Sequence, residues 1–233
     1  GVIKIQGPLK NIFMDITATT DKNTTVNIPL SNSAELNEYP YIEVNDLYGQ
    51  DELETETEYQ ADLSGLQIRF RLIVTPDAEV QIIIDPKLGE IIKGRGNGNL
   101  DMRINTSGDF LMTGDYVIEK GDYLFTLQKF INKKLTIEPG GSIHWDGDPL
   151  DATVDIVANY RTKASLSDLY GTGDEAGSKI WVNDRITMTG KLMRPDVKYD
   201  IYLPDADEST RMSLNSAISS SEELNKQFIA LLT

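Results

Sequence analysis

The sequence has no cysteine and a single histidine among its 233 residues. Disulfides and thiol chemistry are therefore excluded, while the absence of cysteine fits the cytosol and the periplasm alike. Zinc binding is not supported either, because zinc sites are built from clusters of cysteine and histidine. The chain also lacks an apolar run near the ~20 residues that span a bilayer, and residues 1–10 have no signal-peptide core.

Positive charge is scarce as well. Lys and Arg number 22 against 37 Asp and Glu, which gives a net charge of −15. Binding to phosphate backbones needs concentrated Lys and Arg, so nucleic acid is excluded as a partner, and an anionic membrane surface is disfavoured. The remaining composition, with 39% hydrophobic and 25% charged residues, is typical of a folded domain and not of a disordered chain.

What the sequence does contain is strand periodicity, which is clearest over residues 94–160. Apolar residues occupy every second position in short runs, which is the period of a strand with one buried face. Three such runs are Leu100-Met102-Ile104, Tyr123-Phe125-Leu127 and Val154-Ile156-Ala158. Turn residues separate the runs at Gly108-Asp109, Gly114-Asp115, Gly121-Asp122, Gly140-Gly141 and Gly147-Asp148-Pro149. The pattern predicts an antiparallel meander of short strands without long crossovers.

Upstream of this region, two strands joined at Gly7-Pro8 are expected within residues 2–18. Residues 24–30 alternate as a further strand, in which Pro29 indicates an edge. Residues 66–74 form the best alternating segment, and together with residues 80–84 they predict a hairpin around a turn at 75–78. The acidic run at residues 51–58 is interpreted as a solvated loop. A calcium site is the alternative, but the run lacks the internal Gly of a calcium loop.

Downstream, residues 161–179 lose the period and are polar and glycine-rich, which predicts a long loop. Strands resume at residues 180–182, 186–188 and 197–203. From residue 207 the apolar spacing changes to three or four, with Asp207 or Ser209 as a helix cap and a serine cluster at 219–221 that would divide the helix. We expect one β domain over residues 1–206 and a helical segment over residues 207–233.

Few residues suggest catalysis. His144 lies between Ile143 and Trp145, so in a strand it points outward, and the sequence shows no nucleophile and acid placed around it. A cation could bind the three acidic residues that follow, but the Gly-Asp-Pro turn is a sufficient reason for two of them. These three residues are Asp146, Asp148 and Asp151. We therefore expect no catalytic residue, no metal and no cofactor.

The glycine-rich segment at residues 94–98 resembles a nucleotide-binding loop only superficially. A phosphate-binding loop opens a helix, whose free N–H groups point at the anion, whereas the alternation here predicts that a strand follows. A glycine-rich turn or a β-bulge is the better interpretation.

The strands carry one-sided apolar rows, and the single helical tail cannot cover all of them. A sheet hides an apolar face by packing on another sheet, by closing into a barrel, or by curling over a ligand. The residue pattern is compatible with all three solutions.

Several spaced motifs resemble a known family. They are G-x-G-x-L from Gly96 to Leu100, G-D-Y-x-I-x-x-G-D-Y-x-F from Gly114 to Phe125, G-G-x-I-x-W-x-G-D-P-x-D-A from Gly140 to Ala152, and A-N-Y from Ala158 to Tyr160. In this order they resemble the C-terminal domain of TamB, over about residues 66–203. The resemblance implies an all-β fold, mainly an antiparallel meander, which curls into a taco-like or open-barrel sheet with an apolar concave face and carries a C-terminal helix.

The resemblance also implies a function. It indicates a non-enzymatic periplasmic module that shields apolar cargo between the inner and outer membranes, in phospholipid transport or outer-membrane protein assembly. The implied partners are an outer-membrane barrel of the TamA type and lipid acyl chains or unfolded outer-membrane proteins. The chain ends in the middle of a helical pattern, so we expect it to be part of a longer chain anchored in the inner membrane.

Two other functions are weighed against this one. The first is a protein-interaction module, in which an exposed sheet edge pairs with the barrel partner or with a client. The second is a carbohydrate-binding β-sandwich, which would need clustered aromatic residues. The two tryptophans and ten tyrosines are scattered instead, so this last function ranks lowest.

If the sheet is an open trough, its lining is predicted from the apolar side of each strand. The alternative for each of these residues is a dry, closed core. The predicted lining consists of Leu66, Ile68, Phe70, Leu72, Leu100, Met102, Ile104, Phe110, Met112, Tyr123, Phe125, Leu127, Leu135, Ile137, Val154, Ile156 and Ala158.

Overall fold

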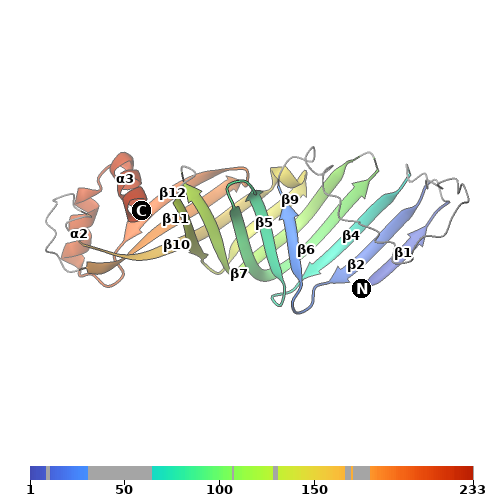
Figure 1. The fold of residues 1–233 in the computed structure, drawn as a ribbon, viewed down its shortest axis with the longest axis horizontal. Helices are drawn as coiled ribbons and strands as arrows, with labels where there is room; N and C mark the ends of the chain where they lie inside the picture. The colour runs from blue at the N-terminus through green and yellow to red at the C-terminus, as the bar shows by residue number, and fades with distance from the viewer. Residues whose placement is uncertain are drawn as a thin grey trace, which may run out of the picture.

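A computed structural model describes residues 1–8, 11–30, 65–106, 108–127, 131–165, 169 and 179–232. These residues form a twelve-stranded, mainly antiparallel sheet and two C-terminal helices, arranged as an elongated body (Figure 1). The sheet is curled without closing into a clear barrel, which confirms the predicted fold class. The acidic run at 51–58 and most of the predicted loop at 161–179 lie outside the described residues.

The N-terminal half of the sheet begins with a wall of neighbouring strands. Strand β1 (Val2–Gln6) pairs antiparallel with β2 (Phe13–Thr19), as the sequence predicts. Strand β2 then pairs in parallel with β4 (Gln67–Val74), and β4 pairs antiparallel with the C-terminal part of β6 (Glu90–Asn105). We call β1, β2, β4 and this part of β6 the first wall.

A second wall stands against the first. Strand β3 (Thr25–Pro29) pairs in parallel with β5 (Glu79–Asp85), and β5 pairs with the N-terminal part of β6. In Figure 1, β5 and the neighbouring blue arrow of β3 cross in front of the diagonal strands of the first wall. The predicted hairpin between residues 66–74 and 80–84 is therefore wrong: the turn at Thr75 to Ala78 carries the chain from one wall to the other.

The long strands β7 (Phe110–Leu127) and β10 (Thr153–Ser165) continue the sheet beyond β6 and change partners along their length. Strand β7 pairs with β6 as far as Leu124. On its other side it pairs with β9 (Gly141–Gly147) as far as Ile118, and with β8 (Ile131–Ile137) from Gly121. Strand β10 likewise pairs first with β9 and then with β8. The predicted turns at Gly114-Asp115 and Gly121-Asp122 are thus wrong, because both pairs lie inside β7.

The bend between the walls coincides with a β-bulge. The register of β6 and β7 shifts between Arg95 and Gly96, which leaves Glu119 as an extra residue on β7. A bulge increases the local twist and bends the strand. Of the turn and the bulge weighed for residues 94–98, the structure has a bulge, with its extra residue on the facing strand β7. Gly96 is required there, because a Cβ atom would lie 1.9 Å from the carbonyl oxygen of Val117.

The C-terminal part of the sheet is formed by two further strands. Strand β11 (Lys179–Lys191) pairs with β10, and β12 (Arg194–Tyr202) pairs with β11. Residues 180–182 and 186–188, predicted as separate strands, are parts of β11. Residues 161–165, assigned to a loop from the sequence, extend β10.

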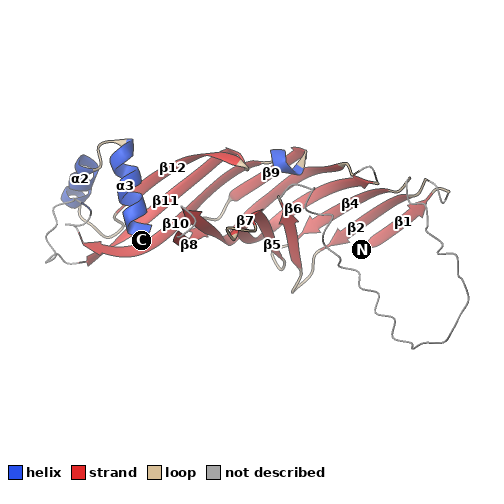
Figure 2. Cartoon of the chain, turned by 45° about the horizontal axis from the view of Figure 1, so that its top comes forward, coloured by secondary structure: helices blue, strands red, loops and turns tan. Residues whose placement is uncertain are grey.

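The helical tail is divided as the serine cluster predicts. Asp207 caps helix α2 (Glu208–Ala217), its carboxylate accepting from the backbone N–H of Thr210 at 2.8 Å, and α3 (Ser221–Leu232) follows. Figure 2 shows both helices gathered at the end of the body that holds β10, β11 and β12. Helix α3 packs on β12 through Phe228, whose ring centroid lies 4.4 Å from that of Tyr199.

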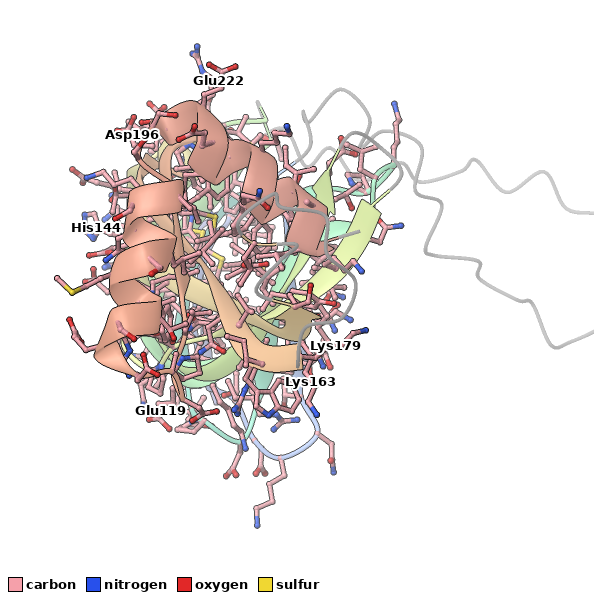
Figure 3. The ribbon with its side chains drawn as sticks, turned by 90° about the vertical axis from the view of Figure 1, so that its left-hand side faces the viewer. Glu119, His144, Lys163, Lys179, Asp196 and Glu222 are labelled. Carbon is pink, nitrogen blue, oxygen red and sulfur yellow. The ribbon has the colours of Figure 1, made fainter. Side chains whose placement is uncertain are left out.

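The core runs between the walls and continues beneath α3. Its largest fully buried side chains include Trp145, Tyr116 and Phe228. Seen along the long axis in Figure 3, the strands curve around a filled interior, with the helices nearest the viewer. The middle of the body is therefore a packed core.

Candidate functional site: the groove face of the first wall

The register of the first wall aligns apolar side chains into continuous rows. Directly paired residues of neighbouring strands point to the same face of a sheet. One row crosses β2, β4, β6 and β7 as Ile16, Phe70, Met102 and Met112. The next row, farther from the packed core, consists of Met14, Ile68, Ile104 and Phe110. We call this side of β2, β4, the C-terminal part of β6 and the start of β7 the groove face.

Exposure increases along the groove face. Leu100 and Met112, next to the packed core, are 3% and 0% exposed. Phe70 and Met102 are half-buried, while Ile104 and Phe110 reach 42% and 39% exposure. The apolar surface thus passes from sealed to open without a break in its rows.

A pocket of about 580 Å³ lies against the groove face. Strand β3 forms its opposite side, and the turn after β9 contributes Pro149 and Leu150. The lining is mainly apolar and consists of Val26, Asn27, Ile28, Pro29, Phe70, Leu72, Leu100, Met102, Gly108, Asp109, Phe110, Leu111, Met112, Asp148, Pro149 and Leu150. Such a concave apolar site with few polar groups is the usual form of a ligand pocket.

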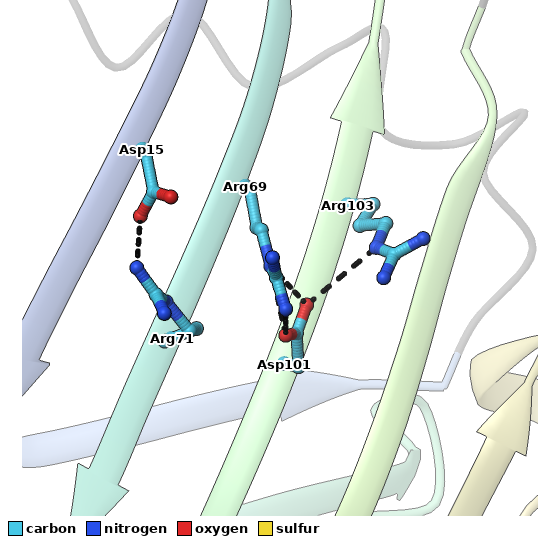
Figure 4. A network of polar contacts seen from close by, with 5 residues as sticks. All are labelled: Asp15, Arg69, Arg71, Asp101 and Arg103. Carbon is cyan, nitrogen blue, oxygen red and sulfur yellow. Dashed lines mark hydrogen bonds and ion pairs between the residues drawn. The ribbon is translucent and has the colours of Figure 1, made fainter. Parts of the chain in front are cut away.

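The other side of the same wall is ionic. Arg69 pairs with Asp101 at 2.5 Å and Arg71 pairs with Asp15 at 2.5 Å, while Arg103 lies 3.7 Å from Asp101 (Figure 4). Hydrogen bonds from Arg69, supported by its charge, lower the pKa of Asp101. The alternation of charged and apolar residues therefore fixes which side of the wall faces the pocket, because reversal would bury these ions.

The structure places sixteen of the seventeen predicted lining residues in two environments. Those that are buried in the packed interior are Leu72, Leu100, Met112, Tyr123, Leu135, Ile137, Val154, Ile156 and Ala158. Those that are half-buried or exposed are Leu66, Ile68, Phe70, Met102, Ile104, Phe110 and Phe125. The side chain of Leu127 lies outside the described residues. Phe70, Leu72, Leu100, Met102, Phe110 and Met112 are the predicted residues that border the pocket.

Sequence reasoning missed the opposite side of the pocket. Val26 and Ile28 alternate visibly in β3, but nothing local indicates that β3 crosses to face β4. Leu150 follows a turn and belongs to no alternating run. Only the pairing of β3 with β5, which is distant in sequence, brings these residues to the groove face.

The residues weighed for catalysis or metal binding lie apart from the pocket interior or serve the backbone. His144 is exposed, as predicted, and its Nδ1 lies 2.7 Å from Oδ1 of Asp115 on the outer surface. Asp148 accepts from the backbone N–H of Leu150 at 2.9 Å and so caps the 3-10 turn η2 (Pro149–Asp151). Over the described ranges, no group of three or more His, Cys, Asp or Glu side chains is arranged to hold a metal ion.

Two acidic groups away from the pocket are shielded from water, Glu90 in part and Asp184 completely. The hydroxyl of Tyr123 donates to Glu90, whose pKa is raised by burial. Asp184 on β11 is fully buried, its carboxylate has no hydrogen-bond partner within the described part of the chain, and burial raises its pKa to about 8. Asp184 is therefore mostly protonated at neutral pH.

Comparison with known proteins identifies one matching family. The family model of the TamB C-terminal domain matches residues 1–233, which is the whole chain. No curated protein matches the chain. Among the described residues, neither α2 nor α3 has the length and apolar character needed to cross a bilayer.

Proposed function

The chain belongs to the TamB C-terminal domain family, and from this premise we propose that its groove face shields apolar cargo in transit between the inner and outer membranes. The family supports a TamB-related role in outer-membrane assembly and suggests a location in the cell envelope. The proposed cargo is phospholipid acyl chains or the apolar segments of unfolded outer-membrane proteins.

The proposal includes a location and a partner. The domain would stand in the periplasm as part of a longer chain anchored in the inner membrane, and it would work with an outer-membrane barrel of the TamA type. The family supports an envelope location and an outer-membrane assembly partner.

One observation carries the proposal: the rows of the groove face continue from the sealed core into a half-exposed surface that borders the pocket. An acyl chain cannot cross water at low cost, because each exposed CH₂ costs about 0.8 kcal/mol. A continuous apolar face lowers this cost at every position along its length. No reacting group is needed, because the cargo is moved without being altered.

The test compares two residues of the same strand. Phe70 lies on the groove face, whereas Ile73 lies on the ionic side of β4 and is 43% exposed. A photo-crosslinking amino acid at position 70 should capture lipid from cells, and the same amino acid at position 73 should capture little. Phe70→Arg should abolish lipid capture from a crosslinker at Phe110, while Ile73→Arg should leave it unchanged.

The urea midpoint of each variant is the accompanying control. Phe70 is only half-buried, and the apolar stem of an arginine can lie along the wall while its charge reaches water. Both arginine variants should therefore stay folded. If Phe70→Arg unfolds the chain, or if both positions capture lipid equally, the groove face is not a cargo path.

A second candidate function rests on strand β1. This strand pairs with β2 on one side and ends the strand order of the described sheet, and its Val2, Ile3 and Ile5 are 57%, 63% and 64% exposed. An open edge of this kind can pair with a strand of another protein. Proline at Lys4 would then abolish capture of the barrel partner, whereas Phe70→Arg would not.

A further inference from the structure

The outer face of β10 and β11 carries an exposed tryptophan surrounded by cations. Trp181 is 39% exposed and lies opposite Lys163 in the register of the two strands. The Nζ atom of Lys163 is 4.7 Å from the centroid of the indole ring, and the Cζ atom of Arg161 is 4.5 Å from it. Two cation–π contacts thus converge on one exposed ring.

A third cation extends this group. Lys179 begins β11 two residues before Trp181, on the same side of the strand. Figure 3 shows Lys163 and Lys179 on the same side of the molecule. Of these three cations, only Arg161 forms an ion pair within the described part of the chain, at 3.5 Å from the exposed Asp205. Such a solvated pair contributes little and can be exchanged.

A small cleft adjoins the cations where β10 ends beside α3. It has a volume of about 300 Å³, and its lining includes the two lysines, Lys163 and Lys179. Its floor contains the buried side chains of Ala164 and Leu169, and Leu231 of α3 closes one side. The cleft therefore combines apolar side chains with two lysines, and the ammonium group of Lys163 lies over the adjoining indole ring.

We propose that Arg161, Lys163, Lys179 and Trp181, together called the cationic patch, dock the chain onto the phosphate-bearing surface of a lipid bilayer. Indole rings prefer the boundary between headgroups and acyl chains, and each Lys or Arg near an anionic leaflet adds attraction. The cleft suits a phosphate at its rim and the first carbons of a lipid on its floor.

The net charge of −15 opposes such docking only at long range. The Debye length is about 8 Å at physiological ionic strength, so charges farther from the contact are largely screened. An acidic protein segment would also satisfy the cations, but it would not require an exposed ring beside an apolar floor. A lipid surface would engage the cations, the exposed indole ring and the adjoining apolar cleft.

The patch is separate from the groove face, since it lies on the outer side of β10 and β11. Its loss leaves the proposed cargo path intact, and the two proposals can fail independently. If both hold, the end of the body that carries α2 and α3 is the end that meets a membrane.

The experiment measures partitioning of the chain onto vesicles by co-sedimentation. Vesicles of phosphatidylcholine with phosphatidylglycerol should bind the chain, and vesicles of phosphatidylcholine alone should bind it weakly. Each lysine neutralised in the patch should lower the partition coefficient about fivefold, so Lys163→Gln with Lys179→Gln should lower it about 25-fold. Trp181→Ala should also reduce binding to the mixed vesicles.

The matched control neutralises two exposed lysines elsewhere, Lys22→Gln with Lys120→Gln. This control changes the net charge equally and should leave partitioning nearly unchanged. Brominated lipids should quench Trp181 fluorescence, which a Trp181→Phe variant separates from that of the buried Trp145. Equal losses in the control, absence of vesicle binding, or binding to polyglutamate instead of vesicles would each overturn the proposal.

Discussion

Gly94 lies directly opposite Gly121 where β6 and β7 pass from the first wall to the second. A Cβ atom on Gly121 would stand 2.4 Å from the carbonyl oxygen of Lys93, so the two backbones meet more closely than side chains allow. The bulge at Gly96 follows immediately. The bend that creates the pocket therefore depends on a few positions without side chains.

The first prediction concerns this bend. Gly96→Ala should lower the free energy of unfolding by about 3 kcal/mol or more, because its Cβ atom would collide with the backbone of Val117. Denaturant unfolding followed by circular dichroism measures the loss.

Gly140→Ala is the matched control. Gly140 has a positive φ of 96°, but nothing lies within 4 Å of the Cβ position. Gly140→Ala should lower the free energy of unfolding only by the backbone strain, roughly 1–3 kcal/mol. This loss should be smaller than that of Gly96→Ala. Equal costs would mean that the close approach of β6 and β7 does not control the bend.

The second prediction separates the sealed part of the apolar surface from its open part. Ile156 is 0% exposed, so Ile156→Ala should lower the free energy of unfolding by about 2–5 kcal/mol. Ile104 is 42% exposed, so Ile104→Ala should cost less than about 1 kcal/mol.

Urea midpoints at constant slope measure both variants. A large loss for Ile104→Ala would show that the groove face is covered in solution, which would contradict an open cargo path. A small loss for Ile156→Ala would show that the interior is not packed.

The third prediction concerns Asp184. Its folded-state pKa of about 8 lies above the ordinary value of 3.8, because burial disfavours the charged form. Between these values the folded chain keeps the proton and the unfolded chain releases it. Stability should therefore fall as pH rises from about 4 to about 8, by up to roughly 1.4 kcal/mol per pH unit.

Asp184→Asn has nearly the same shape but cannot ionise, so its stability profile should be much flatter in this range. Urea midpoints from pH 5 to about pH 9 compare the two chains over the titration of this buried carboxyl group. If wild type and variant have the same slope, Asp184 is not the group responsible.

Much of the sheet could be predicted from local pattern. Because the side-chain period of a strand is 2, alternation predicts that Ile68, Phe70 and Leu72 share one face. In β4 these three side chains do lie on the same face. Asp207 was one of two expected caps, since its carboxylate can accept from the backbone N–H groups of the first helical turn. The outward position of His144 followed from its place between two apolar residues.

Two glycines that the sequence pattern places in turns lie inside a strand. Gly114 and Gly121 each precede an Asp and were assigned to turns, but both lie within β7. A turn and a close approach of two backbones both require glycine. Only the partner strand distinguishes them, and that strand is distant in sequence.

The sequence by itself determined which side chains share a face, because alternation depends on nothing beyond neighbouring residues, and it determined that this chain is a mainly antiparallel β protein with a helical end. Only the tertiary structure decided which parts of that apolar face are sealed and which are open. That difference arises from pairings between distant segments, β3 with β5 and β2 with β4, and from the bulge that folds the walls together. The energy of burial depends on what lies opposite a side chain, which no local pattern contains.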